Sequence, residues 1–280
     1  MSKVAAIQMA SGPNVKANLA EAEKLIKIAV QQAAELVVLP ENFAIMGTAE
    51  TDKVKIAEDF GSGPLQKYLK EQAIKRNIWL VGGTIPLRSN EPGKVYAACL
   101  LYNPQGEVAA RYDKIHLFDV TIGDHNESYT ESETIVPGDK VVVVDTPFGR
   151  LGLAVCYDLR FPELFRAMVK QNMEICALPS AFTSLTGKVH WESLLRARSI
   201  ENLSFIIAAD QGGYHVGGRE THGDSMIIDP WGLVLNRLPH GTGVVVAHID
   251  VAKLEHTRKM FPALEHKRFE CNLPVKVNDK

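Results

Sequence analysis

The feature that most constrains the fold of this chain is an internal repeat in the order of its apolar segments. Each copy has a strand, a helix, a strand, a helix, a strand and then a hairpin. The first copy has strands at 4–9, 36–39 and 78–82, helices at about 19–29 and 65–76, and a hairpin of 95–102 with 108–114. The second copy has strands at 151–155, 175–178 and 205–209, helices at 162–171 and 190–200, and a hairpin of 224–228 with 233–236. Two such units predict an α/β fold in which two sheets face each other between helix layers.

The repeat also bears on the number of domains. The two copies join at about residues 130–147, and no low-complexity segment interrupts the chain. With 280 residues, 46% of them hydrophobic, the chain can bury a large core. We therefore predict one α/β domain over residues 1–274 and a loose tail at 275–280.

Charge and hydropathy exclude several classes of partner. The formal net charge is −2, and no basic stripe interleaved with aromatic residues is present, so we expect neither nucleic acid nor an anionic membrane as partner. The apolar run at 4–9 is too short for a signal peptide, and no span of about 18 apolar residues occurs. A cytoplasmic protein is expected.

The four cysteines are Cys99, Cys156, Cys176 and Cys271. None is paired with another at a C-x-x-C spacing, so the sequence indicates neither a zinc site nor a disulfide framework. We expect reduced thiols, no metal and no cofactor.

Cys156 stands where an apolar strand meets a helix that begins at Pro162. On such a corner, backbone N–H groups and the helix N-terminus lie near the thiol, and both favour the thiolate and any oxyanion formed beside it. Cys156 is therefore a candidate nucleophile. The alternative, from this window alone, is a small buried apolar residue, as free cysteines usually are.

Two other apolar strands end in a charged residue, namely Glu41 and Lys114. Taken singly, such a glutamate fits a solvated loop and such a lysine fits an edge-protecting charge. With a thiol, however, an acid and a cation complete the set that activates a nucleophile and holds an oxyanion. Glu41 and Cys156 follow strands of the two repeats, so equivalent sheet ends can bring them into one pocket.

Three motifs resemble those of a known family. They are Leu39-Pro40-Glu41-Asn42, Tyr112-Asp113-Lys114-Ile115-His116-Leu117-Phe118 and Cys156-Tyr157-Asp158-Leu159-Arg160-Phe161-Pro162-Glu163. In order and spacing they are similar to the Glu, Lys and Cys motifs of the nitrilase, or carbon–nitrogen hydrolase, superfamily. The resemblance implies an αββα sandwich, hydrolysis of a small-molecule amide through a cysteine thioester, no cofactor, and a homodimer or higher homo-oligomer.

The resemblance also implies roles for the motif residues. Glu41 becomes the general base, and Lys114 stabilises the oxyanion together with the backbone N–H of Tyr157. The family uses a second glutamate near the lysine, for which Glu127 and Glu131 are both candidates. We favour Glu131 because it lies a few residues before a Pro-Gly pair, as in the family; the alternative is that the acidic loop is merely solvated.

Within the superfamily, several segments look like the branch that hydrolyses deaminated glutathione to 2-oxoglutarate and cysteinylglycine. They are Pro179-Ser180-Ala181-Phe182, Thr186-Gly187, His190-Trp191-Glu192, Leu194-Leu195-Arg196-Ala197-Arg198 and Asp229-Pro230-Trp231-Gly232. The ω-amidase branch, which acts on α-ketoglutaramate, typically has Gly where Ser180 stands. A nitrile or N-carbamoyl hydrolase and an inactive scaffold of the same fold remain alternatives.

Candidate substrate-binding residues come from two sources. Residues beside the motifs and strand ends are Tyr157, Arg160, Phe182 and Thr183. Because both substrates carry carboxylates, Arg198 and Arg219 join Arg160 as candidates on charge alone.

Overall fold

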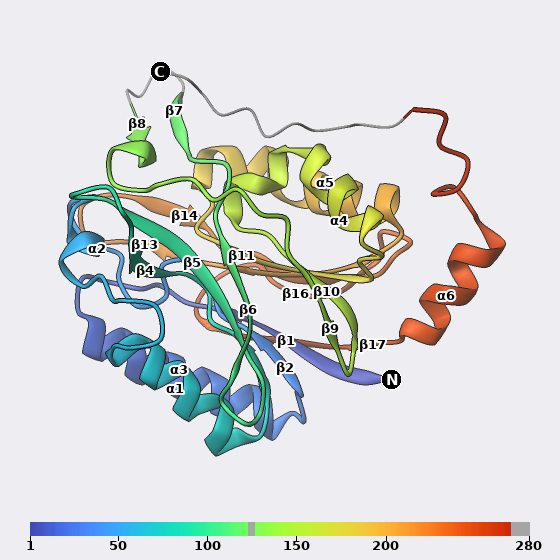
Figure 1. Ribbon diagram of the computed structural model, residues 1–280, viewed down its shortest axis with the longest axis horizontal. Coiled ribbons are helices and arrows are strands. Elements are labelled where there is room, and N and C mark those ends of the chain that lie inside the picture. The colour runs from blue at the N-terminus through green and yellow to red at the C-terminus, as the bar shows by residue number, and fades with distance from the viewer. Residues whose placement is uncertain (123–126, 270–280) are drawn as a thin grey trace.

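The computed structural model describes residues 1–122 and 127–269. Two sheets lie face to face, with helices on the outer face of each (Figure 1). Helices α1 (Val15–Gln31) and α3 (Pro64–Arg76) cover one sheet, and α4 (Pro162–Lys170) and α5 (Ser184–Asn202) cover the other. This layer order confirms the predicted αββα sandwich.

The first sheet contains the strands of the first repeat together with β4 (Ile85–Arg88) and β17 (Gly243–Ile249). Its spatial order is β17, β1 (Ser2–Gln8), β2 (Leu36–Val38), β3 (Trp79–Val81), β5 (Val95–Tyr102) and β4, with β6 (Val108–Asp113) also paired to β5. Strands β1, β2 and β3 are parallel, whereas β17 pairs antiparallel with β1. The parallel strands therefore present their carboxyl ends at one edge.

The second sheet repeats this arrangement. Its spatial order is β16 (Val234–Leu238), β15 (Ser225–Ile228), β12 (Phe205–Asp210), β11 (Ile175–Ser180), β10 (Gly149–Leu153) and β9 (Val143–Thr146). Strands β10, β11 and β12 are parallel. Parallel strands need covered faces, and the helices supply that cover.

Smaller elements complete the described chain. They are α2 (Asp52–Lys55), the β7 (Asp119–Ile122) and β8 (Glu127–Thr130) pair, the 3-10 helices η2 (Glu131–Glu133) and η3 (Cys156–Arg160), the β13 (Gly212–Tyr214) and β14 (Glu220–His222) pair, and α6 (Val251–Met260). No helix in the described ranges is long and apolar enough to cross a membrane.

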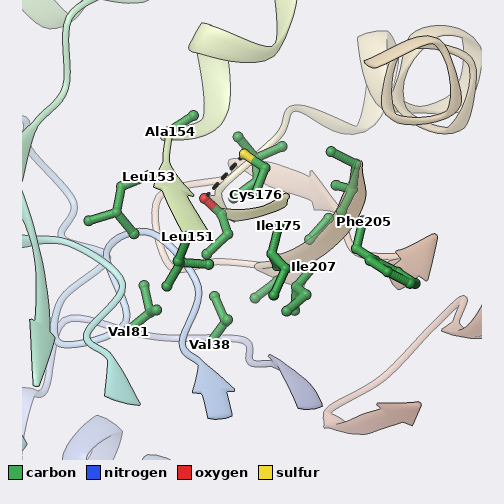
Figure 2. Close-up of a cluster of buried hydrophobic side chains, with 14 of the residues drawn as sticks. Val38, Val81, Leu151, Leu153, Ala154, Ile175, Cys176, Phe205 and Ile207 are labelled. Carbon is green, nitrogen blue, oxygen red and sulfur yellow. Dashed lines mark hydrogen bonds between the residues drawn. The ribbon is translucent and has the colours of Figure 1, made fainter. Parts of the chain in front are cut away.

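The core is divided by the alternation of side chains along the strands. In β1, Val4 and Ala6 pack in the cluster between the sheets, while Ala5 and Ile7 pack with α1 and α3. Because both faces are buried, the strand is a continuous apolar run rather than an alternating one. Figure 2 shows side chains of both sheets in the inner cluster, among them Val38 and Val81 from the first and Leu151, Leu153 and Ile207 from the second.

The repeat predicted the main elements of both sheets, with differences at some ends. The helix expected at 190–200 begins earlier, at Ser184. Strands β4 and β9, which lie at the sheet edges, were not predicted. Strand β17 and helix α6 were also not predicted, since they follow the second copy of the repeat. The expected tail at 275–280 and Cys271 lie outside the described residues.

Candidate active site

A cavity of about 500 Å³, open to solvent, lies where the parallel strands of both sheets end. Its lining brings together side chains that are far apart in the sequence. Among the predicted site residues, those that line it are Glu41, Lys114, Glu131, Cys156, Tyr157, Phe182, Thr183 and Arg219. Glu41 and Cys156 thus share a pocket, as predicted from the strand ends, and Lys114 lies in the same pocket.

Lys114 is at the centre of the charged groups. It directly follows β6 and is 2% exposed, and its Nζ lies 2.9 Å from Oε1 of Glu41 and 2.9 and 2.8 Å from the two carboxylate oxygens of Glu131. Burial alone would lower the pKa of Lys114, but the charges of Glu131 and Glu41 outweigh burial and hold that pKa well above its usual range. The lysine is therefore a fixed cation between two carboxylates.

Glu131 reaches Lys114 from η2. One of its carboxylate oxygens also accepts the backbone N–H of Phe118 at 2.7 Å. Burial opposes its charge, yet the Lys114 ammonium and these hydrogen bonds lower the pKa of Glu131 below its usual value. For the competing candidate, Glu127, the structure describes the backbone in β8 but not the side chain.

Cys156 occupies a sharp corner between β10 and η3. Its backbone φ is +47°, a value that residues other than glycine rarely adopt. Such backbone strain is often found at functional residues. Burial and the nearby charge of Glu41 raise the pKa of the Cys156 thiol well above its usual range. Lys114 and a hydrogen bond from the Ala181 backbone act in the opposite direction. The resting thiol therefore keeps its proton at neutral pH.

A buried carboxylate joins the lysine segment to the cysteine corner. Asp158 is completely buried, and it accepts hydrogen bonds from the Tyr112 hydroxyl at 2.6 Å and the Val155 backbone N–H at 2.8 Å. It also accepts the His116 backbone N–H at 3.1 Å, and the His116 Nδ1 lies 2.7 Å away. Tyr112 and His116 flank Lys114, so Asp158 sets the position of the lysine relative to the corner.

Tyr112, His116 and Asp158 lie within the motifs but had no predicted role. The available signal was their spacing, because Tyr112 and His116 stand two residues on either side of Lys114. If the predicted strand continued to His116, residues two apart would put Tyr112, Lys114 and His116 on one face. In the structure the strand ends at Asp113.

Two arginines that were candidates on charge do not line the cavity. The guanidinium of Arg160 lies 5.1 Å from the centroid of the Phe182 ring, and its Nη1 lies 3.1 Å from Nδ1 of His190. Arg198 is buried, donating to the Leu159 carbonyl at 3.0 Å and pairing with Glu201 at 3.0 Å. Arg198 thus links η3 to α5 instead of facing the cavity.

The lining also contains charged residues that sequence analysis missed. Glu50 and Lys53 form an ion pair of 2.6 Å at the start of α2 and line the cavity. A four-residue helix has no apolar periodicity, and neither residue follows a strand, so no sequence signal marked them. Within residues 1–122 and 127–269, no cluster of three or more His, Cys, Asp or Glu side chains is arranged to hold a metal ion.

A four-layer sandwich with a thiol, a lysine and two glutamates in a strand-end cavity defines a carbon–nitrogen hydrolase of the nitrilase type. The carbon-nitrogen hydrolase family model matches residues 3–259, and the chain belongs to that family.

Two named relatives are similar to this chain over nearly its whole length. The chain is 42% identical over 279 residues to the deaminated glutathione amidase of Yersinia enterocolitica, covering 99% of this chain and 97% of that protein. It is 44% identical over 268 residues to the deaminated glutathione amidase of a Synechocystis strain, covering 95% and 97%.

Solved structures share the fold. The Caenorhabditis elegans NitFhit protein has a TM-score of 0.86 at 36% identity, covering 95% of this chain but only 65% of the NitFhit chain. Nit3 of Saccharomyces cerevisiae, described as a member of branch 10 of the nitrilase superfamily, has a TM-score of 0.85 at 30% identity and covers 96% and 97%.

Proposed function

We propose that this carbon–nitrogen hydrolase cleaves the amide bond of deaminated glutathione, releasing 2-oxoglutarate and cysteinylglycine. The observation that carries the proposal is Lys114 held between Glu41 and Glu131 in the cavity that contains Cys156. The substrate rests on the names of relatives that are 42% and 44% identical over nearly the whole chain.

The first half-reaction forms a thioester. Glu41 takes the proton of the Cys156 thiol as the sulfur attacks the amide carbon, and the carbonyl electron pair moves to oxygen. The Lys114 ammonium and the Tyr157 backbone N–H stabilise this oxyanion. When the tetrahedral intermediate collapses, the C–N bond breaks and Glu41 returns the proton to the departing amine of cysteinylglycine.

The second half-reaction releases the acid. Glu41 takes a proton from water, whose oxygen attacks the thioester carbon, and collapse of the second oxyanion expels the Cys156 sulfur. That sulfur regains a proton from Glu41. The raised pKa of the resting thiol suits this cycle, because the proton must leave during attack and return at its end.

Glu131 acts through Lys114 in this proposal. Its two oxygens fix the ammonium and offset its charge, and it orients the Lys114–Glu41 pair beside the amide nitrogen. Tyr157, Phe182 and Thr183 line the cavity and contact the substrate. Arg160 supports this wall from behind, through its contact with the Phe182 ring.

The proposal extends to the setting of the enzyme. Residues 1–274 act as one domain, in line with the family match over 3–259. Free thiols at Cys99, Cys156 and Cys176 support a reducing compartment, and we place the enzyme in the cytoplasm. We propose a homodimer or a larger homo-oligomer, which light scattering on the purified protein tests.

The substrate test compares two amides that share the 2-oxoglutaryl group. We expect 2-oxoglutarate to form from deaminated glutathione with a higher kcat/KM than from α-ketoglutaramate. The reason is that only deaminated glutathione carries a cysteinylglycine group, which can make further contacts with the cavity. Ammonia assays miss the preferred reaction, so 2-oxoglutarate itself must be measured. Equal or better use of α-ketoglutaramate would assign the chain to the ω-amidase branch.

A further inference from the structure

The cavity continues into a second, larger one of about 1120 Å³. The two share five lining residues, which are Asn42, Glu50, Lys53, Tyr129 and Arg219. The shared residues form the boundary between an inner chamber that holds Cys156 and an outer vestibule. Any group bound at this boundary lies within reach of a substrate whose reacting carbon is on the thiol.

Three cations line the inner chamber, and they differ in their partners. Lys114 pairs with Glu41 and Glu131, and Lys53 pairs with Glu50 at 2.6 Å. Arg219 has no carboxylate within 4.0 Å in the part of the chain that the structure describes. Among the described side chains of this lining, its charge is thus the one without a carboxylate partner.

Arg219 is nevertheless held in place by neutral groups. Its Nη2 donates to the Ala181 carbonyl at 3.0 Å, and the guanidinium lies 5.2 Å from the centroid of the Tyr129 ring. Its Nε is buried with no hydrogen-bond partner among the described residues. Because the Ala181 backbone also contacts the Cys156 sulfur, one peptide segment ties the guanidinium to the reacting atom.

The loop that carries Arg219 is itself anchored. The His215 backbone N–H donates to the Arg219 carbonyl at 2.8 Å, and the turn between them uses Gly217 and Gly218 at φ of +101° and +89°. The His215 ring is buried and bonds to the Ser11 carbonyl at 2.8 Å. A fixed loop presents the charge at a defined place, which lowers the entropy cost of binding an anion.

We propose that Arg219 receives the carboxylate of the acyl half of the substrate, which makes the site selective for monoamides of 2-oxo dicarboxylic acids. This inference rests on the proposed function. In a five-carbon acyl chain the carboxylate carbon lies about 5 Å from the amide carbon when extended. A carboxylate at that distance supplies an anion for Arg219 through charge-assisted hydrogen bonds.

A purely structural role for Arg219 makes a different prediction. As a clamp on the Ala181 carbonyl, it would support Cys156 equally for every substrate. Arg219→Gln separates the two roles, because glutamine keeps N–H donors for that carbonyl but removes the charge. Arg88→Gln is the matched control, since Arg88 lies on the surface, paired with Asp59 at 3.4 Å.

The experiment measures kcat and KM on two amides of equal chain length. One is α-ketoglutaramate, and the other is 4-oxopentanamide, in which a methyl group replaces the carboxylate. We expect Arg219→Gln to lower kcat/KM for α-ketoglutaramate by about 10- to 100-fold, mainly through KM, and to change that for 4-oxopentanamide less than about twofold. Arg219→Lys should recover part of the loss, and Arg88→Gln should behave as wild type.

Two results overturn the inference. Equal losses on both amides would assign Arg219 a structural role, and an unchanged kcat/KM on α-ketoglutaramate, with loss confined to deaminated glutathione, would place the carboxylate of the leaving peptide there instead. Thermal melting and the stoichiometry of Cys156 alkylation establish that each variant is folded. Failure of the wild-type enzyme on deaminated glutathione and both amides would instead reject the proposed function.

Discussion

At the scale of the residue, the chemistry of Cys156 depends on charges that oppose each other. Burial and Glu41 favour the neutral thiol, whereas Lys114 and the Ala181 hydrogen bond favour the thiolate. Burial and Glu41 outweigh the other two, so the resting thiol is neutral. A base must therefore remove the Cys156 proton while the substrate is bound.

The raised pKa of Cys156 predicts the pH dependence of its alkylation. A thiol whose pKa is raised is neutral below that pKa, and its thiolate fraction grows as the pH rises toward it. Labelling by iodoacetamide should therefore accelerate steadily from pH 6 to pH 9, by about tenfold per pH unit, and exceed that of the fully buried Cys99 and Cys176. Mass spectrometry of the labelled peptide measures the rate. A rate that stops rising below pH 8 would show a stable thiolate and contradict the raised pKa.

The second glutamate is tested by a charge-removing substitution. Glu131→Gln should lower kcat by about 100-fold or more, because a neutral amide no longer fixes the Lys114 ammonium. Glu133→Gln, in the same short helix but exposed, is the matched control and should change kcat little. A large loss in Glu127→Gln with little in Glu131→Gln would show that the other pair is the functional one.

The site residues that follow strands could be predicted from the sequence, whereas those in loops and in the short helix could not. Glu41, Lys114 and Cys156 each follow an apolar strand, a pattern readable without coordinates. Lys53 lies in a short helix, and Arg219 follows a turn that contains two glycines. Neither segment has an apolar periodicity, so only the fold shows that both residues reach the cavity. Charge alone ranked Arg160 and Arg198 equally with Arg219, although the three face different surroundings.

At the scale of the element, β6 and the β10–η3 corner act as a unit through Asp158. The buried carboxylate accepts hydrogen bonds from Tyr112, which lies in the first sheet, and from Val155, which follows β10 of the second sheet. Asp158→Asn should therefore lower the free energy of unfolding by about 1.5–3 kcal/mol and lower kcat more than it changes KM. Urea titration and steady-state kinetics measure the two effects.

Tyr112→Phe should have a smaller effect than Asp158→Asn on both stability and kcat. It removes one hydrogen bond but leaves the carboxylate with its other partners, so it should cost about 1 kcal/mol and lower kcat less. An Asp158→Asn enzyme with wild-type kcat would separate the network from catalysis.

Element boundaries were predicted where apolar periodicity was strong. Both hairpins and the parallel strands lie where the repeat placed them, because a strand buried on both faces is a continuous apolar run. The start of α5 was placed too late, since its first turns carry polar residues and Gly187, which resemble a loop in sequence. Strand β17 was missed because its partner, β1, is more than 230 residues away.

At the scale of the molecule, the site depends on how the two sheets face each other. Glu41 and Lys114 follow strands of the first sheet and Cys156 follows a strand of the second, so the inner apolar cluster sets their separation. Leu153 is completely buried there, and Leu153→Ala should lower the free energy of unfolding by about 2–5 kcal/mol. Leu233→Ala, at a site 63% exposed, is the control and should change it by less than about 0.5 kcal/mol.

The central claim is that Cys156 forms the covalent intermediate. Its most direct test is the steady-state release of cysteinylglycine from deaminated glutathione by Cys156→Ala, beside a Cys176→Ala control in the buried core. The account predicts that Cys156→Ala folds normally and loses about 10⁴-fold or more in kcat, while Cys176→Ala keeps its activity. Release by Cys156→Ala within tenfold of the wild-type rate would contradict the mechanism.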